Sequence, residues 1–184
     1  MSIKKVLVEA LKDNNRRYKL QYFVTFIILA IVSMVMTIVN IKTKQHLLTY
    51  VTLAFSLLSI VNVFLIYINN VTYYISKTIF AIEIISLFSY FIVSGQPEGF
   101  SVIWSLMLPS LGLLLFGFKQ GTLLSTLMFV VIVTFFWIPA GQNILLYEYN
   151  ATFMLRFPFA YIAFYFVGLL FEIMRSKTFD NYHY

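Results

Sequence analysis

The stretch LQYFVTFIILAIVSMVMTIVNI, from Leu20 to Ile41, carries no charged side chain. An α-helix needs about 20 mostly apolar residues to cross about 30 Å of bilayer hydrocarbon. Lys42 and Lys44 follow it with no small-residue cleavage pattern in between, and its apolar part is too long for a cleavable signal peptide. The stretch therefore predicts a retained membrane span.

Further stretches of the same kind follow, and the short connections between them force neighbouring helices to run antiparallel. The predicted fold class is all-α, a bundle of six transmembrane helices with both termini cytoplasmic. We expect residues 1–18 to form an interfacial segment, residues 19–175 the transmembrane domain, and residues 176–184 a cytoplasmic tail that begins a signalling helix. The other five predicted spans are His46–Ile68, Thr72–Gly95, Phe100–Phe118, Thr122–Gly141 and Thr152–Met174.

Composition excludes an ordinary soluble domain and most catalytic chemistry. The chain has 184 residues, of which 61% are hydrophobic and only 11% charged, whereas soluble domains are roughly a quarter charged. It has no cysteine, and His46 and His183 lie too far apart for a familiar metal site. No phosphate loop, nucleophile elbow or paired carboxylates are present, so we predict no catalytic residue, no metal and no cofactor.

The distribution of lysine and arginine predicts the orientation, because positive loops stay on the cytoplasmic side. With the N-terminus inside, nine basic residues are cytoplasmic, and only Lys42 and Lys44 are outside. This explains the net charge of +6 without a nucleic-acid partner. We expect a multi-pass protein of the cytoplasmic membrane. The cytoplasmic set comprises Lys4, Lys5, Lys12, Arg16, Arg17, Lys19, Lys119, Arg175 and Lys177.

The segment before the first span has apolar residues at helical spacing and charged residues on its other faces. Such a stretch can lie in the headgroup plane with its bases near anionic lipid. A solvated helix or a frayed terminus is the alternative. The apolar positions are Ile3, Val6, Leu7, Ala10 and Leu11.

Charged residues inside predicted spans include Glu83, near the middle of the third, and Arg156, in the outer third of the sixth. Charges in the bilayer are costly and mark functional sites. One hypothesis pairs Glu83 with Arg156, or leaves Arg156 to hold an anionic ligand group. The other lets Arg156 reach the outer headgroups, with Glu83 protonated and hydrogen-bonded to serine or tyrosine.

The fourth, fifth and sixth predicted spans contain prolines and many aromatic residues. Pro109, Pro139 and Pro158 each remove an N–H and free a carbonyl one turn earlier, which predicts kinks in the fourth, fifth and sixth spans. Most of the aromatic residues are expected to pack or to form interface belts. A minority could line a gap between helices, and the chosen wall residues are Trp104, Trp137 and Tyr161.

Several motifs in the second half of the chain resemble a known membrane region. They are PEGFSVIWSLMLP (97–109), LLFGFKQG (114–121), FFWIP (135–139), FMLRFP (153–158) and FEIMR (171–175). Together they resemble the six-helix membrane region ahead of GGDEF output domains in clostridial diguanylate cyclases. The resemblance implies sensing or signal transfer, usually in a dimer, and implies no cyclase activity in this chain.

These observations lead to a primary hypothesis: a sensor module that binds a small apolar or amphiphilic ligand, or senses the bilayer, and moves its last helix. Arg156 would orient the polar end of a lipid-like ligand, with Glu83 as its possible partner. The sixth helix is the expected homodimer contact, and it continues as a charged helix unless it frays beyond Lys177. The alternatives are a small transporter or substrate-capturing subunit, and a purely structural membrane partner.

Overall fold

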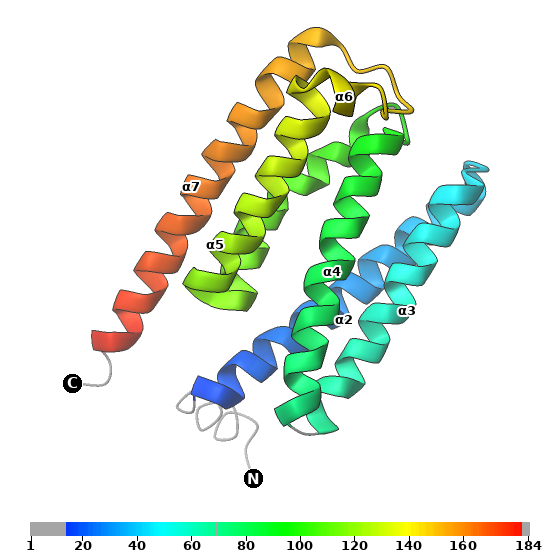
Figure 1. Cartoon of the computed structure of the whole chain (residues 1–184). Helices are drawn as coiled ribbons and strands as arrows, with labels where there is room; N and C mark the ends of the chain where they lie inside the picture. The colour runs from blue at the N-terminus through cyan, green and yellow to red at the C-terminus, as the bar shows by residue number, and fades with distance from the viewer. Residues whose placement is uncertain (1–13, 69, 182–184) are drawn as a thin grey trace. The chain divides into compact units, whose positions relative to one another are not determined.

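The computed structural model describes residues 14–68 and 70–181. Within them the chain is helical and has no strand (Figure 1). The predicted interfacial segment lies mostly outside these residues. The last helix continues past Lys177 and ends at Asn181. The elements are α2 (Asn14–Lys42), α3 (His46–Ile68), α4 (Asn70–Ser94), the 3₁₀ helix η1 (Phe100–Met107), α5 (Leu108–Trp137), α6 (Pro139–Gln142) and α7 (Ala151–Asn181).

Five helical stretches among the described residues are long and apolar enough to cross a membrane. Four agree closely with predicted spans, and the other covers the predicted fourth and fifth spans together. The multi-pass membrane class is therefore supported, while the number of crossings stays a prediction. The five stretches are Lys19–Lys42, His46–Ile66, Thr72–Ser94, Phe100–Trp137 and Ala151–Arg175.

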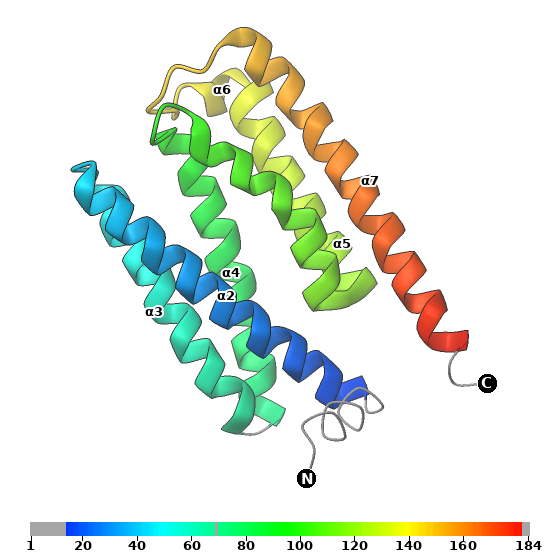
Figure 2. The ribbon, with the colours of Figure 1, turned by 180° about the vertical axis from the view of Figure 1, so that it is seen from behind.

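The stretch Phe100–Trp137 is folded back on itself at Gly117. This residue has φ 72° and ψ −179°, a backbone conformation that side chains disfavour and glycine tolerates. A Cβ built on Gly121 would lie 2.6 Å from the carbonyl oxygen of Gly112, although nine residues of straight helix would separate them by about 13.5 Å. The two limbs of this hairpin, residues 108–116 and 118–137, run in opposite directions in both views (Figures 1 and 2).

The first limb is short, and the 3₁₀ helix before it supplies the missing length. Eight residues of η1 rise about 16 Å and nine α-helical residues about 13.5 Å, together close to the thickness of the hydrocarbon. Pro109 lies in the first turn of α5, where its missing N–H leaves no hydrogen bond unmade. The prediction of a kink at Pro109 is therefore wrong, because this proline begins a helix.

The predicted fifth span, Thr122–Gly141, extends beyond the end of the helix. Pro139 follows that end and does not kink the helix, contrary to the prediction. α5 ends at Trp137, and Ile138 is extended, with φ −97° and ψ 125°. Proline disfavours the helical conformation of the residue before it. Pro139 then begins the single turn of α6.

The chain divides into two compact units, residues 1–83 (unit 1) and residues 84–184 (unit 2). In unit 1, α2 and α3 form an antiparallel pair joined by a tight turn in which Lys44 has φ 57°. A buried hydrogen bond of 2.9 Å joins Thr37 to Thr52 across this pair. In unit 2, α7 lies along the second limb of the hairpin (Figures 1 and 2).

Candidate functional site

The connections at one end of unit 2, which we call the loop end, are held together by an aromatic column. The Tyr149 and Phe153 rings stack with centroids 5.5 Å apart, and the Phe153 and Phe157 rings with centroids 5.1 Å apart. Phe136, at the end of α5, meets Tyr149 edge-on at 5.2 Å. The column joins the loop before α7, the first turns of α7 and the end of α5.

Tyr149 also secures this loop to the end of α4. Its hydroxyl donates to the carbonyl oxygens of Phe91 at 3.3 Å and Ile92 at 2.8 Å. Both carbonyls belong to the last turn of α4, where helical donors run out; the Phe91 oxygen also accepts from the Gly95 N–H at 3.0 Å. Burial, and secondarily the neighbouring Tyr147, raise the pKa of the Tyr149 phenol, so the hydroxyl stays a neutral donor. The loop end is therefore a fixed frame.

A groove opens between the end of α5 and the start of α7 at the loop end. Its volume is about 390 Å³, within the range of small-molecule sites. Its walls are mostly aromatic and aliphatic, and its polar groups are the Trp137 indole and the Gln142 amide, which donates to the Phe136 carbonyl oxygen at 2.6 Å. The lining residues are Phe136, Trp137, Gln142, Ala151, Met154, Leu155 and Phe159.

Trp137 pairs with a carbonyl that Pro158 leaves without its helical donor. Pro158 lies inside α7 and has no N–H, so the Met154 carbonyl four residues earlier loses its usual partner. The indole Nε1–H of Trp137 donates to that Met154 oxygen at 3.1 Å. This bond joins α5 to the proline turn of α7 on the wall of the groove.

A double-mutant cycle tests this bond. Trp137→Phe removes the indole donor and is expected to lower the free energy of unfolding by about 1 kcal/mol. In a Pro158→Ala background the helix supplies its own N–H to Met154, so the additional cost of Trp137→Phe should largely vanish. Equal costs in both backgrounds, measured by unfolding in detergent micelles, would mean that the bond contributes nothing.

A second hollow lies further along the same two helices. It has a volume of about 210 Å³ and is lined by Tyr161, Ser125, Phe129 and neighbours on α5 and α7. The Tyr161 hydroxyl is buried and donates to the Ser125 carbonyl oxygen at 3.0 Å. Tyr161 therefore fastens α7 to the second limb of the hairpin and shapes the wall of this hollow.

The predicted site residues do not all come together. Trp137 lines the groove and Tyr161 the second hollow, whereas Trp104 lies in η1 and lines neither. Arg156 is exposed on α7, next to Leu155 of the groove wall. Glu83 belongs to unit 1, where Asn62 donates to it at 3.3 Å. Because Glu83 and Arg156 belong to different units, their pairing stays a prediction.

Sequence reasoning did not identify Gln142, Met154 or Phe159 as part of the groove. Pro158 was the available signal for Met154, because the carbonyl that a proline frees is four residues before it. Gln142 and Phe159 carry no such local signal. Their place in the groove depends on the turn of α6 and on the rotation of α7 against α5.

The family model MASE6 matches residues 13–181, which is most of the chain. MASE domains are membrane-associated sensor domains found in signalling proteins. No curated protein and no solved structure matches the chain.

Proposed function

The chain belongs to the MASE6 family, and on that premise we propose that it is a membrane-embedded sensor module that binds an anionic amphiphile and relays the event through α7. In this proposal the chain crosses a bacterial cytoplasmic membrane six times, with both ends cytoplasmic. The reversal at Gly117 supports six crossings, because it divides Phe100–Trp137 into two limbs. Lys119 beside the reversal is then cytoplasmic, as the distribution of positive charge requires.

The groove at the loop end is the proposed ligand site, and its position beside Arg156 carries the proposal. In the six-crossing topology this end faces the outer leaflet. Arg156 lies three residues before Phe159 of the groove wall, so the two side chains are neighbours on the surface of α7. An acyl chain can occupy the aromatic walls, while the guanidinium binds a carboxylate or phosphate headgroup.

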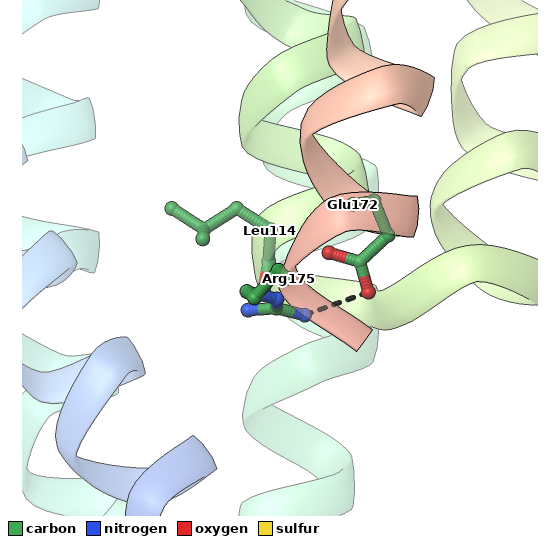
Figure 3. A network of polar contacts seen from close by, with 3 residues as sticks. All are labelled: Leu114, Glu172 and Arg175. Carbon is green, nitrogen blue, oxygen red and sulfur yellow. Dashed lines mark hydrogen bonds and ion pairs between the residues drawn. The ribbon is translucent and has the colours of Figure 1, made fainter. Parts of the chain in front are cut away.

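The proposed relay of ligand binding uses α7, because this helix forms one wall of the groove and also makes polar contacts at the opposite end of unit 2. We call the contacts of Arg175 with Glu172 and Leu114 the clasp. There Arg175 bonds Glu172 at 2.7 Å and donates to the Leu114 carbonyl oxygen at 3.2 Å (Figure 3). Leu114 is near the end of the first limb, where the reversal at Gly117 leaves carbonyls without helical donors. A shift of α7 at the groove therefore changes its fit at the hairpin turn.

Beyond Arg175 the helix continues to Asn181 and would enter the cytoplasm. We propose that α7 passes its movement to a cytoplasmic output domain, with a GGDEF diguanylate cyclase as the expected kind, and that two copies associate through α7. A MASE sensor domain is not itself catalytic. The sensor would then act on cyclic di-GMP synthesis only through that partner domain.

The test uses three probes with the same sixteen-carbon chain and different heads: palmitate, hexadecanol and hexadecyltrimethylammonium. Palmitate should raise the melting temperature of the full chain most. Arg156→Gln should weaken palmitate binding at least about tenfold, or about 1.4 kcal/mol, and leave hexadecanol binding unchanged. Arg156→Lys, which keeps the charge, serves as the matched control and should lose less.

The place of binding is tested by fluorescence. In a Trp104→Phe background Trp137 is the remaining tryptophan, and brominated palmitate in the groove should quench it. Equal binding of the three probes, unchanged by Arg156→Gln, would refute an anionic ligand. Palmitate binding without quenching of Trp137 would refute the groove.

A further inference from the structure

Unit 1 contains a buried polar cluster between α3 and α4. Asn62 is at its centre, because its Nδ2 donates to Glu83 Oε2 at 3.3 Å and its Oδ1 accepts from the Ser76 hydroxyl at 2.8 Å. Ser59, Asn62 and Ser76 are at most 1% exposed, and Glu83 is 9% exposed. The cluster combines one carboxyl group with an amide and hydroxyls between two mainly apolar helices.

Two oxygens of the cluster, Ser59 Oγ and Glu83 Oε1, are buried and make no hydrogen bond. Ser59 is one turn from Asn62 on the same face of α3. Asn62 bonds both Ser76 and Glu83, so it lies level with the middle of the α4 segment between those two residues. α3 and α4 run in opposite directions (Figure 1), so Ser59, about 4.5 Å further along, comes level with Glu83. The two residues with unpartnered oxygens therefore lie at the same level of the two helices.

The charge of Glu83 is also uncompensated within the described part of unit 1, where the carboxyl makes no ion pair. Lys77, on the same helix, lies over the rings of Tyr22 and Tyr73, at 5.7 and 5.8 Å from their centroids. Lys19 lies over the Tyr73 ring as well.

Among the side chains of unit 1 that the structure describes, the other charged groups, Lys42 and Lys44, are at the turn between α2 and α3. Along their apolar lengths, α2 between Lys19 and Lys42 and α3 after His46 carry no charged residue that could neutralise Glu83. An isolated carboxylate in this setting is costly, so a bound positive charge is required.

We propose that Glu83 is a proton-binding site: its carboxylate takes up a proton from the aqueous phase on Oε1, and the resulting O–H donates a hydrogen bond to Ser59 Oγ, directly or through one water molecule. The exchange is balanced, since a carboxylate and a proton give a neutral carboxylic acid. Two available oxygens suit a proton, whereas an oxygen-bound metal cation takes about six ligands. Unit 1 would thus respond to protons independently of the ligand groove in unit 2.

Infrared spectroscopy of the full chain in lipid nanodiscs tests the proposal, because a protonated carboxyl has its own carbonyl stretching band. We expect this band at neutral pH in the wild type and its loss in Glu83→Gln. Glu148→Gln, which changes an exposed carboxyl, is the matched control and should leave the band intact. A spectrum in which Glu83 is ionised from about pH 5 to about pH 9 would overturn the proposal.

Ser59→Ala supplies a second measurement that does not depend on the folding of Glu83→Gln. Removal of the hydroxyl should shift the carboxyl band to higher frequency, because the acid loses its acceptor. An unshifted band would refute the role of Ser59. Loss of the band when sodium chloride replaces choline chloride at constant pH would assign the site to a metal cation and overturn the proton.

Discussion

Gly121→Val is expected to unfold the hairpin of unit 2, with a loss of about 4 kcal/mol or more in the free energy of unfolding. A Cβ at this position would lie 2.6 Å from both the Gly112 carbonyl oxygen and the Leu113 Cα. These are backbone atoms, so no rotamer change relieves the overlap and the limbs must separate. The measurement is denaturant unfolding of the purified chain in micelles, followed by circular dichroism.

Gly112→Ala is the matched control for this prediction. Its added Cβ would meet the Leu124 side chain and Ser125 Oγ at 3.5 Å, an ordinary contact distance. Both substitutions lie in the same hairpin, and both replace glycine in an α-helical element. If Gly121→Val were as stable as Gly112→Ala, the two limbs could not be packed as closely as described.

Arg175→Ala is expected to cost about 3 kcal/mol, because it leaves a buried carboxylate without its partner. Glu172 is 8% exposed and receives the guanidinium at 2.7 Å, and the same guanidinium donates to the Leu114 carbonyl (Figure 3). In a chimera with a reporter output domain, the variant should also separate ligand binding from output. Palmitate should still bind, because the groove is at the other end of α7, but the output should not respond.

Two variants isolate the cause of this effect. Lys119→Ala removes an exposed positive charge near the same hairpin turn and should change stability by less than about 0.5 kcal/mol. Replacing Glu172 and Arg175 together by leucine should cost less than Arg175→Ala alone, since no buried charge remains. If the double variant were the less stable one, the unpaired charge of Glu172 would not be the cause of the loss in Arg175→Ala.

Together the two predictions distinguish the contacts that stabilise unit 2 from the contacts that transmit the signal. The close approach at Gly121 holds the hairpin together, and the clasp at Arg175 fastens α7 to the turn of that hairpin. A sensor needs a rigid hairpin at Gly121 and a contact at Arg175 that changes when the ligand binds. Loss of the hairpin should abolish ligand binding, whereas loss of the clasp should abolish only the response.

Local sequence was enough to predict the class and most of the helices. Hydropathy is a sum over consecutive residues, so the apolar run from Leu20 to Ile41 identifies a helix whatever it packs against. The predicted helix bounds were wrong at Pro109 and Pro139, where kinks inside helices were expected. One begins a helix and the other follows its end, because proline is compatible with a first helical turn and restricts the residue before it.

The candidate site was predictable only in its local parts. Pro158 indicates by itself that the Met154 carbonyl lacks a donor, since both groups belong to one helix. That Trp137 supplies the donor depends on how α5 and α7 are rotated against each other. Residues 21 positions apart, such as Asn62 and Glu83, meet only after two helices pack, and no local pattern encodes that meeting.

The amino-acid sequence alone determined that this is a multi-pass membrane protein with charged groups at Glu83 and Arg156, because apolar length and charge are properties of the chain itself. The tertiary structure decided which oxygens surround Glu83, which groove lies beside Arg156, and where the long apolar stretch reverses. Each of these depends on distances between helices, and side-chain packing sets those distances only once the helices have come together.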